Sequence, residues 1–133
     1  GVAAEFYAAL ADTTAAEAVL EDAEATASEI GHVTTRIRVR RARARLALQR
    51  GTVDEAVEAA RQALALGEAL ALHQPFEQGQ TLLLLGEAYQ AGGDRTQVVE
   101  SWRRARQIFA DLGAAWHLRQ TEEALGRAGA THA

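Results

Sequence analysis

Apolar residues recur at helical spacing along the chain, and the clearest stretch runs from residue 82 to residue 113. In its second half an i, i+4, i+7, i+11 series is formed by Val98, Trp102, Ala105 and Phe109. That spacing places the four side chains on one face of a helix. Gly92 and Gly93 interrupt the stretch and predict a tight turn between two antiparallel helices. Because Gly86 has no side chain, we expect the second helix to approach the first closely there.

The same periodicity predicts an all-α chain that forms one domain over residues 1–133. The expected helices are seven, at about 2–11, 15–30, 33–50, 53–73, 76–91, 95–111 and 114–128. Glycines at 31, 51 and 113 are expected to end three of them. Apolar residues make up 48% of the chain but aromatic residues only 5%, which favours closely packed helices over a sheet.

Three similar helix-start motifs indicate an internal repeat. Each places a capping side chain three positions before Glu or Gln, at Thr14–Glu17, Thr52–Glu55 and Asp94–Gln97. The motifs recur about every 40 residues, which is a period typical of helical-pair repeats. We therefore expect about three helix pairs, at about 1–31, 32–74 and 75–113. A final helix at 114–128 would cap the end of the array.

The best-conforming unit resembles the tetratricopeptide repeat. The residues that carry this resemblance are Leu85, Gly86, Tyr89, Gly93, Asp94, Trp102 and Ala105. The resemblance implies a right-handed superhelical array of antiparallel pairs whose first helices line a concave groove. The preceding unit departs from the pattern, since Arg43 and Ala44 stand where Leu-Gly is expected and Ala47 stands where Tyr is. Either the Arg43 side chain extends toward water or the register of this helix differs by one residue.

The long repeat period also resembles the C-terminal regions of large bacterial transcriptional regulators, the antibiotic-regulatory-protein and LuxR-type ATP-binding regulators. This likeness implies a cytoplasmic sensor or protein-interaction region within a longer chain. The sequence begins Gly-Val-Ala-Ala without methionine, as we expect of such a fragment.

Arginines are concentrated between residues 36 and 45, and the resemblance places Arg38, Arg41 and Arg45 on the concave groove. From the next pair it adds Gln80, Leu83, Glu87 and Gln90. An arginine row suits an acidic peptide segment or a C-terminal carboxylate. In the alternative interpretation the arginines pair with acids on neighbouring helices. Those candidate acids are Glu17, Glu21, Asp22, Glu24, Glu29, Asp54, Glu55 and Glu58.

The sequence favours a non-catalytic module that binds a protein, a peptide or another domain of its parent chain. Self-association as a homodimer and effector sensing in the groove are the alternatives. A net charge of −4 argues against direct nucleic-acid binding, and no apolar run is long enough to span a membrane. Glu29 and His32 form only half of a carboxylate-bridged metal motif, so we expect no metal or cofactor. Trp102 and Trp116 are interpreted as inter-helix packing residues.

Overall fold

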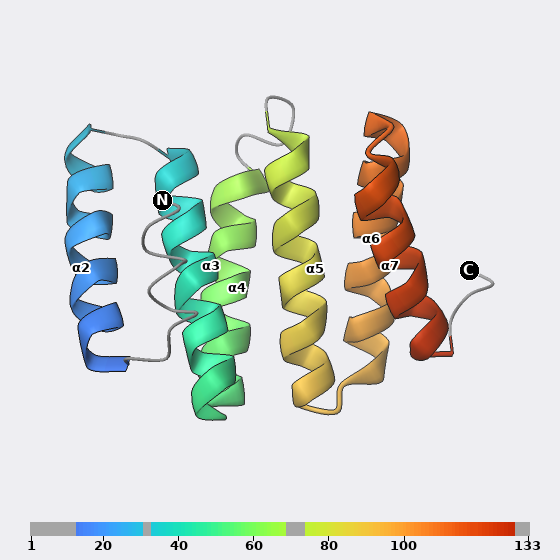
Figure 1. The fold of residues 1–133 in the computed structure, drawn as a ribbon, viewed down its shortest axis with the longest axis horizontal. Helices are drawn as coiled ribbons and strands as arrows, with labels where there is room; N and C mark the ends of the chain where they lie inside the picture. The colour runs from blue at the N-terminus through green and yellow to red at the C-terminus, as the bar shows by residue number, and fades with distance from the viewer. Residues whose placement is uncertain (1–12, 31–32, 69–73, 130–133) are drawn as a thin grey trace.

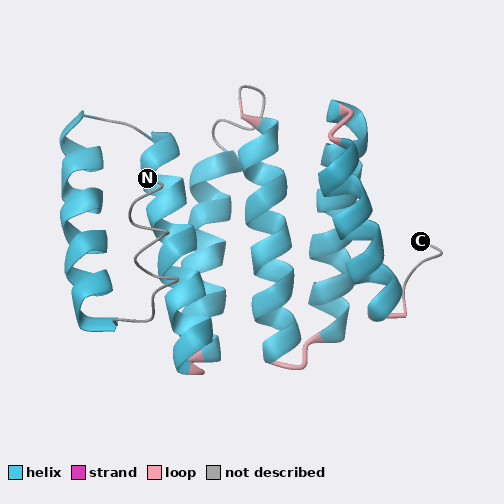
Figure 2. Cartoon of the chain, in the orientation of Figure 1, coloured by secondary structure: helices cyan, strands magenta, loops and turns pink. Residues whose placement is uncertain are grey.

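The protein is helical throughout the part of the chain that the structure describes. The computed structural model describes residues 13–30, 33–68 and 74–129 (Figures 1 and 2). Its helices are α2 (Thr13–Ile30), α3 (Val33–Arg50), α4 (Val53–Glu68), α5 (Pro75–Ala91), α6 (Arg95–Leu112) and α7 (Ala115–Arg127). These six helices, with no strand in the described ranges, confirm the all-α prediction. The expected first helix, at about 2–11, and the end of the fourth, at 69–73, lie outside the described residues.

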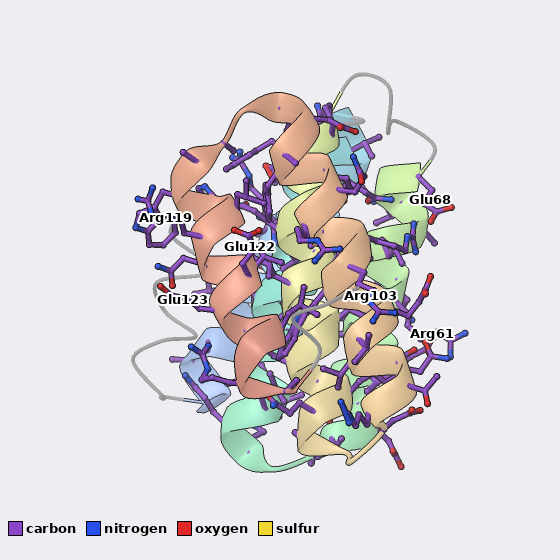
Figure 3. All side chains as sticks on the ribbon, turned by 90° about the vertical axis from the view of Figure 1, so that its right-hand side faces the viewer. Arg61, Glu68, Arg103, Arg119, Glu122 and Glu123 are labelled. Carbon is purple, nitrogen blue, oxygen red and sulfur yellow. The ribbon has the colours of Figure 1, made fainter. Side chains whose placement is uncertain are left out.

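The helices form a row in which each packs against the next along the chain (Figure 1). Helix α3 also packs against α5, although α4 lies between them in the sequence. Turned by 90°, the molecule shows α7 on one side and α4 and α6 on the other (Figure 3). Side chains from α3, α5 and α7 line the cleft described below.

The turns after α3, α5 and α6 share one glycine-dependent geometry. Gly51, Gly93 and Gly113 have φ angles of 78°, 77° and 69°, a region that side chains disfavour. In each turn the residue after this glycine donates its amide hydrogen to a carbonyl five positions earlier; the N···O distances are 3.0, 3.0 and 2.9 Å. This is the Schellman pattern, which satisfies the carbonyls at a helix end. The predicted ends at Gly51 and Gly113 and the predicted turn at Gly93 are confirmed.

The predicted helix-start motifs differ from one another in the structure. The Asp94 carboxylate accepts a hydrogen bond from the Gln97 amide at 3.2 Å, as expected of a capping residue. The Thr52 hydroxyl instead donates to the Ala47 carbonyl at 3.1 Å, at the end of the preceding helix. Helix α2 begins at Thr13, one residue before the predicted cap at Thr14.

Glycines inside helices receive large side chains from the neighbouring helix. A Cβ atom at Gly86 would overlap the Trp102 indole, and one at Gly79 would lie 2.7 Å from the Phe109 ring. At either position the added Cβ atom would lie well inside the roughly 3.5 Å at which non-bonded carbon atoms pack favourably. The Trp102 side chain is 3% exposed, and its Nε1 donates to the Leu83 carbonyl at 3.0 Å. The close approach expected at Gly86 and the packing role expected for Trp102 are both confirmed.

The core runs along the row as a series of small clusters. Alanine is frequent between α3, α4 and α5, where Ala44, Ala59 and Ala60 pack with Leu84 and Leu85. At the end of the row, Ala124 and Leu125 of α7 cover Val98 and Trp102 of α6.

The residues of α3 that depart from the repeat pattern differ in burial. Ala44 and Ala47 are buried, whereas Arg43 is half-buried. Ala44 precedes Gly51 by the same spacing as Gly86 precedes Gly93. Both alternatives for Arg43 stay predictions.

Candidate binding cleft

Two of the three arginines predicted for the groove bind one carboxylate of a neighbouring helix. Arg41 is 3% exposed, and its Nη1 lies 3.0 Å from Oε2 of Glu77. Arg38 reaches the other oxygen, with Nη2 2.7 Å from Oε1 of Glu77. Helix α3 is therefore tied to the first turn of α5 by two ion pairs that share Glu77.

Glu77 is placed by the start of α5. Pro75 occupies the beginning of that helix, where its fixed φ is favourable and its missing amide hydrogen costs nothing. A carboxylate in the first helical turn is also favoured by the helix dipole. Arginine pairing with acids of neighbouring helices was the alternative interpretation of the row. The acid used by Arg38 and Arg41 is Glu77, which was not among the candidates.

A further pair joins α2 to α3. Nη1 of Arg50 lies 2.6 Å from Oε1 of Glu17, one of the candidate acids. The hydrogen bond from Arg50 lowers the pKa of the Glu17 carboxyl, and the same bond raises the pKa of Arg50.

The third arginine belongs to a cleft of about 210 Å³ between α3, α5 and α7. Four of the seven predicted groove residues line this cleft: Arg45, Gln80, Leu83 and Glu87. Its other lining residues are Leu84, Trp116 and His117. Gln90 lies elsewhere, in a separate hollow of about 190 Å³ with Arg95, Val98 and Ala128. The structure thus brings together the middle of the predicted groove and adds one wall from α7.

That wall is aromatic. The His117 ring contacts three others, with centroid distances of 4.7 Å to Phe76, 5.1 Å to Phe109 and 4.9 Å to Trp116. His117 is half-buried in this cluster, whereas Trp116 is 59% exposed. The interpretation of Trp116 as an inter-helix packing residue is therefore wrong: one face meets His117 while most of the indole is in contact with solvent.

The two ionic groups of the cleft have opposite charges. Burial raises the pKa of the Glu87 carboxyl above its ordinary value of 4.5, and the nearby positive charge of Arg45 partly offsets the effect. Glu87 is nevertheless an exposed residue, so water still reaches its side chain.

Gln80 is oriented by the buried ion pair behind it. Its Oε1 accepts a hydrogen bond from Nη2 of Arg41 at 3.2 Å. Because the oxygen is held on that side, the amide nitrogen is the end that Gln80 turns away from Arg41. Arg41 therefore acts on the cleft indirectly, by positioning Gln80.

Sequence reasoning missed the contribution of α7, although a signal for it was present. Leu125-Gly126 repeats Leu85-Gly86 at an offset that also places Trp116 opposite Phe76 in α5. That offset predicts a place for α7 like that of α5, and in the structure Trp116 and His117 at its start line the same cleft. Glu77 had no comparable signal, because its partners lie on another helix.

The cleft offers binding groups rather than an assembled reaction centre. The lining residues that the structure describes supply one guanidinium, one carboxylate, one amide and one imidazole, with no hydroxyl or thiol nucleophile among them. Within the described ranges no three His, Asp or Glu side chains gather to hold a metal ion. No helix in those ranges combines the length and apolar character required to cross a membrane.

Comparison with protein-family models, with curated proteins and with solved structures finds no match to this chain. The resemblance to tetratricopeptide repeats stays a prediction that rests on the motifs of the sequence.

Proposed function

We propose that this chain is a tetratricopeptide-like array and a non-catalytic interaction module that binds a protein segment in the cleft between α3, α5 and α7. The segment belongs to a partner protein or to another domain of the parent chain. In this proposal the parent is a bacterial transcriptional regulator, for which the support is the sequence resemblance alone.

The repeat arrangement is supported by the correspondence between α3–α4 and α5–α6. Their internal turns use the same glycine geometry and the same backbone hydrogen bonds, at Gly51 and at Gly93. The packing of α3 against α5 is the contact that first helices of successive pairs make in such arrays. The pair α5–α6 and the single helix α7 continue the series.

The observation that carries the binding proposal is the exposed indole of Trp116 at the wall of the cleft. Large aromatic side chains dominate binding energy at protein interfaces, and the indole of Trp116 is 59% exposed at this wall. Beside it lie the apolar side chains of Leu83 and Leu84 and the polar groups of Arg45 and Gln80. A peptide segment could use both kinds of group, the apolar ones for its side chain and the polar ones for its main chain.

Selection from a phage-displayed library of random peptides tests the proposal. We expect selected peptides to bind the wild-type protein and to lose at least about tenfold in affinity on Trp116→Ala, as aromatic hot spots do. Leu112→Ala is the matched control, since Leu112 is also exposed and apolar but does not line the cleft. Fluorescence anisotropy gives the dissociation constants. Failure to select any peptide, or equal losses in the two variants, would contradict the proposal.

A further inference from the structure

Two of the three arginines expected to receive an acidic segment are already bound to a carboxylate of this chain. Arg41 is buried and bound to Glu77, and Arg38 shares the same carboxylate. Neither side chain lines the cleft, which leaves Arg45 as its only guanidinium among the described residues.

The charge of Arg45 is opposed within the cleft by that of Glu87. Burial already disfavours the ionised form of this carboxyl, as the direction of its pKa shift indicates. A carboxylate from a ligand would meet the negative charge of Glu87 as well as the positive charge of Arg45, since both residues line the cleft. An ammonium group of a ligand would be attracted by Glu87 but repelled by Arg45. A neutral side chain avoids both costs.

The size and lining of the cleft fit one large apolar side chain. Its volume of about 210 Å³ is below the roughly 300–1,000 Å³ typical of small-molecule sites. Leu83 and Leu84 provide aliphatic surface, while Trp116 and His117 provide ring faces and edges. An aromatic or large aliphatic residue would cover the exposed part of the Trp116 indole and gain the offset or edge-on contacts that rings prefer.

A hydrogen-bond donor lies beside this apolar surface. Since Arg41 holds the oxygen of the Gln80 amide, the amide N–H₂ is the group that Gln80 can offer to a ligand. A peptide carbonyl is the neutral acceptor present at every residue of a bound segment.

We infer that the cleft takes a neutral peptide segment, seating one large apolar side chain against Leu83, Leu84 and Trp116 while Gln80 donates to a main-chain carbonyl. This inference rests on the proposed function and names the chemistry of its ligand. It replaces the acidic segment expected from the arginine row.

The decisive experiment measures a selected peptide against a variant whose cleft has lost both charges, Arg45→Gln with Glu87→Gln. A neutral ligand should bind this variant within about threefold of wild type, because the opposed charges contribute little to it. An acidic ligand should lose at least about tenfold, because its ion pair is gone. The matched control is Arg61→Gln with Glu68→Gln, two exposed charges on α4 outside the cleft and on the other side of the molecule from α7 (Figure 3).

Two further measurements use the wild-type protein: the salt dependence of the affinity and an alanine substitution in the peptide. Between about 0.05 and 0.5 M NaCl the affinity for a neutral segment should change by less than about threefold, whereas binding through exposed charges weakens as salt screens them. Replacing the apolar anchor of the peptide by alanine should cost at least about tenfold.

The outcomes separate this inference from the proposed function. The inference is supported if the selected peptides are neutral, share an apolar anchor and bind equally well to the Arg45→Gln, Glu87→Gln double variant. The inference is overturned if the selected peptides are acidic, require Trp116 and do not bind the Arg45→Gln, Glu87→Gln double variant. That result would leave the cleft as the binding site. Peptides insensitive to Trp116→Ala would overturn both.

Discussion

At the scale of single residues, the contact between Gly86 and Trp102 determines how α5 and α6 pack. The indole occupies the space that a Cβ atom at Gly86 would need, and it donates a hydrogen bond to the Leu83 carbonyl one turn earlier. Between α3 and α4 the close contact involves two small residues instead, since Ala44 and Ala60 share one cluster. The two contacts differ: one places an indole against a glycine, and the other packs two alanines together.

Gly86→Ala should destabilise the protein by about 1–3 kcal/mol, because overpacking at Trp102 outweighs the gain in helix propensity. Urea unfolding of the two proteins measures the difference. In a Trp102→Ala background the same change should stabilise by up to about 1 kcal/mol, since only the propensity term remains. The same sign in both backgrounds would show that the indole does not determine the need for glycine.

At the scale of elements, Glu77 fixes α5 against α3. Its carboxylate and main-chain carbonyl are surrounded by polar groups: Arg38 and Arg41 bind the carboxylate, and the Thr81 hydroxyl donates to the carbonyl at 3.0 Å. The Arg41 and Glu77 side chains are only 3% and 10% exposed. Removing one member of such a pair leaves a charge in a poorly solvated position.

Glu77→Gln should therefore cost about 3–5 kcal/mol of unfolding free energy. Glu17→Gln is the matched control, because the Glu17–Arg50 pair is far more exposed and should contribute much less to stability. Chemical denaturation at neutral pH compares the two variants with wild type. Similar losses for both would mean that burial does not set the importance of the Glu77 pair.

At the scale of the whole molecule, α7 is the last helix of the row and packs on α6. Leu125 is 1% exposed and packs with Val98 and Trp102, so α7 covers an apolar surface that α6 would otherwise present to water. The opposite face of α7 carries charged side chains, including Arg119 and Glu123, which point outward (Figure 3). A helix with one apolar and one charged face is the expected form of a terminal cap.

Leu125→Ala should reduce the unfolding free energy by about 2–5 kcal/mol, the cost of a cavity at a fully buried leucine. Glu122→Ala, an exposed change on the same helix, should stay within about 0.5 kcal/mol. Thermal unfolding followed by circular dichroism distinguishes the two. A small effect of Leu125→Ala would indicate that α7 does not belong to the cooperative core.

The helices and their ends follow from the sequence by itself, because the physics that sets them is local. The periodic apolar positions, the glycines at 51, 93 and 113 and the missing side chain at Gly86 act within a few turns of the chain or between adjacent helices. The resemblance to tetratricopeptide repeats also placed Arg45, Gln80, Leu83 and Glu87 on a common surface.

Only the tertiary structure decided the chemistry of the cleft. Whether an arginine faces solvent or a carboxylate depends on which residue of another helix lies opposite, and Glu77 occupies that place for Arg38 and Arg41. Likewise, the exposure of Trp116 depends on how α7 meets α3 and α5. Local spacing assigns a side chain to a face of its own helix. The packing of the helices determines what that face contacts, and so whether a charge is available to bind a ligand.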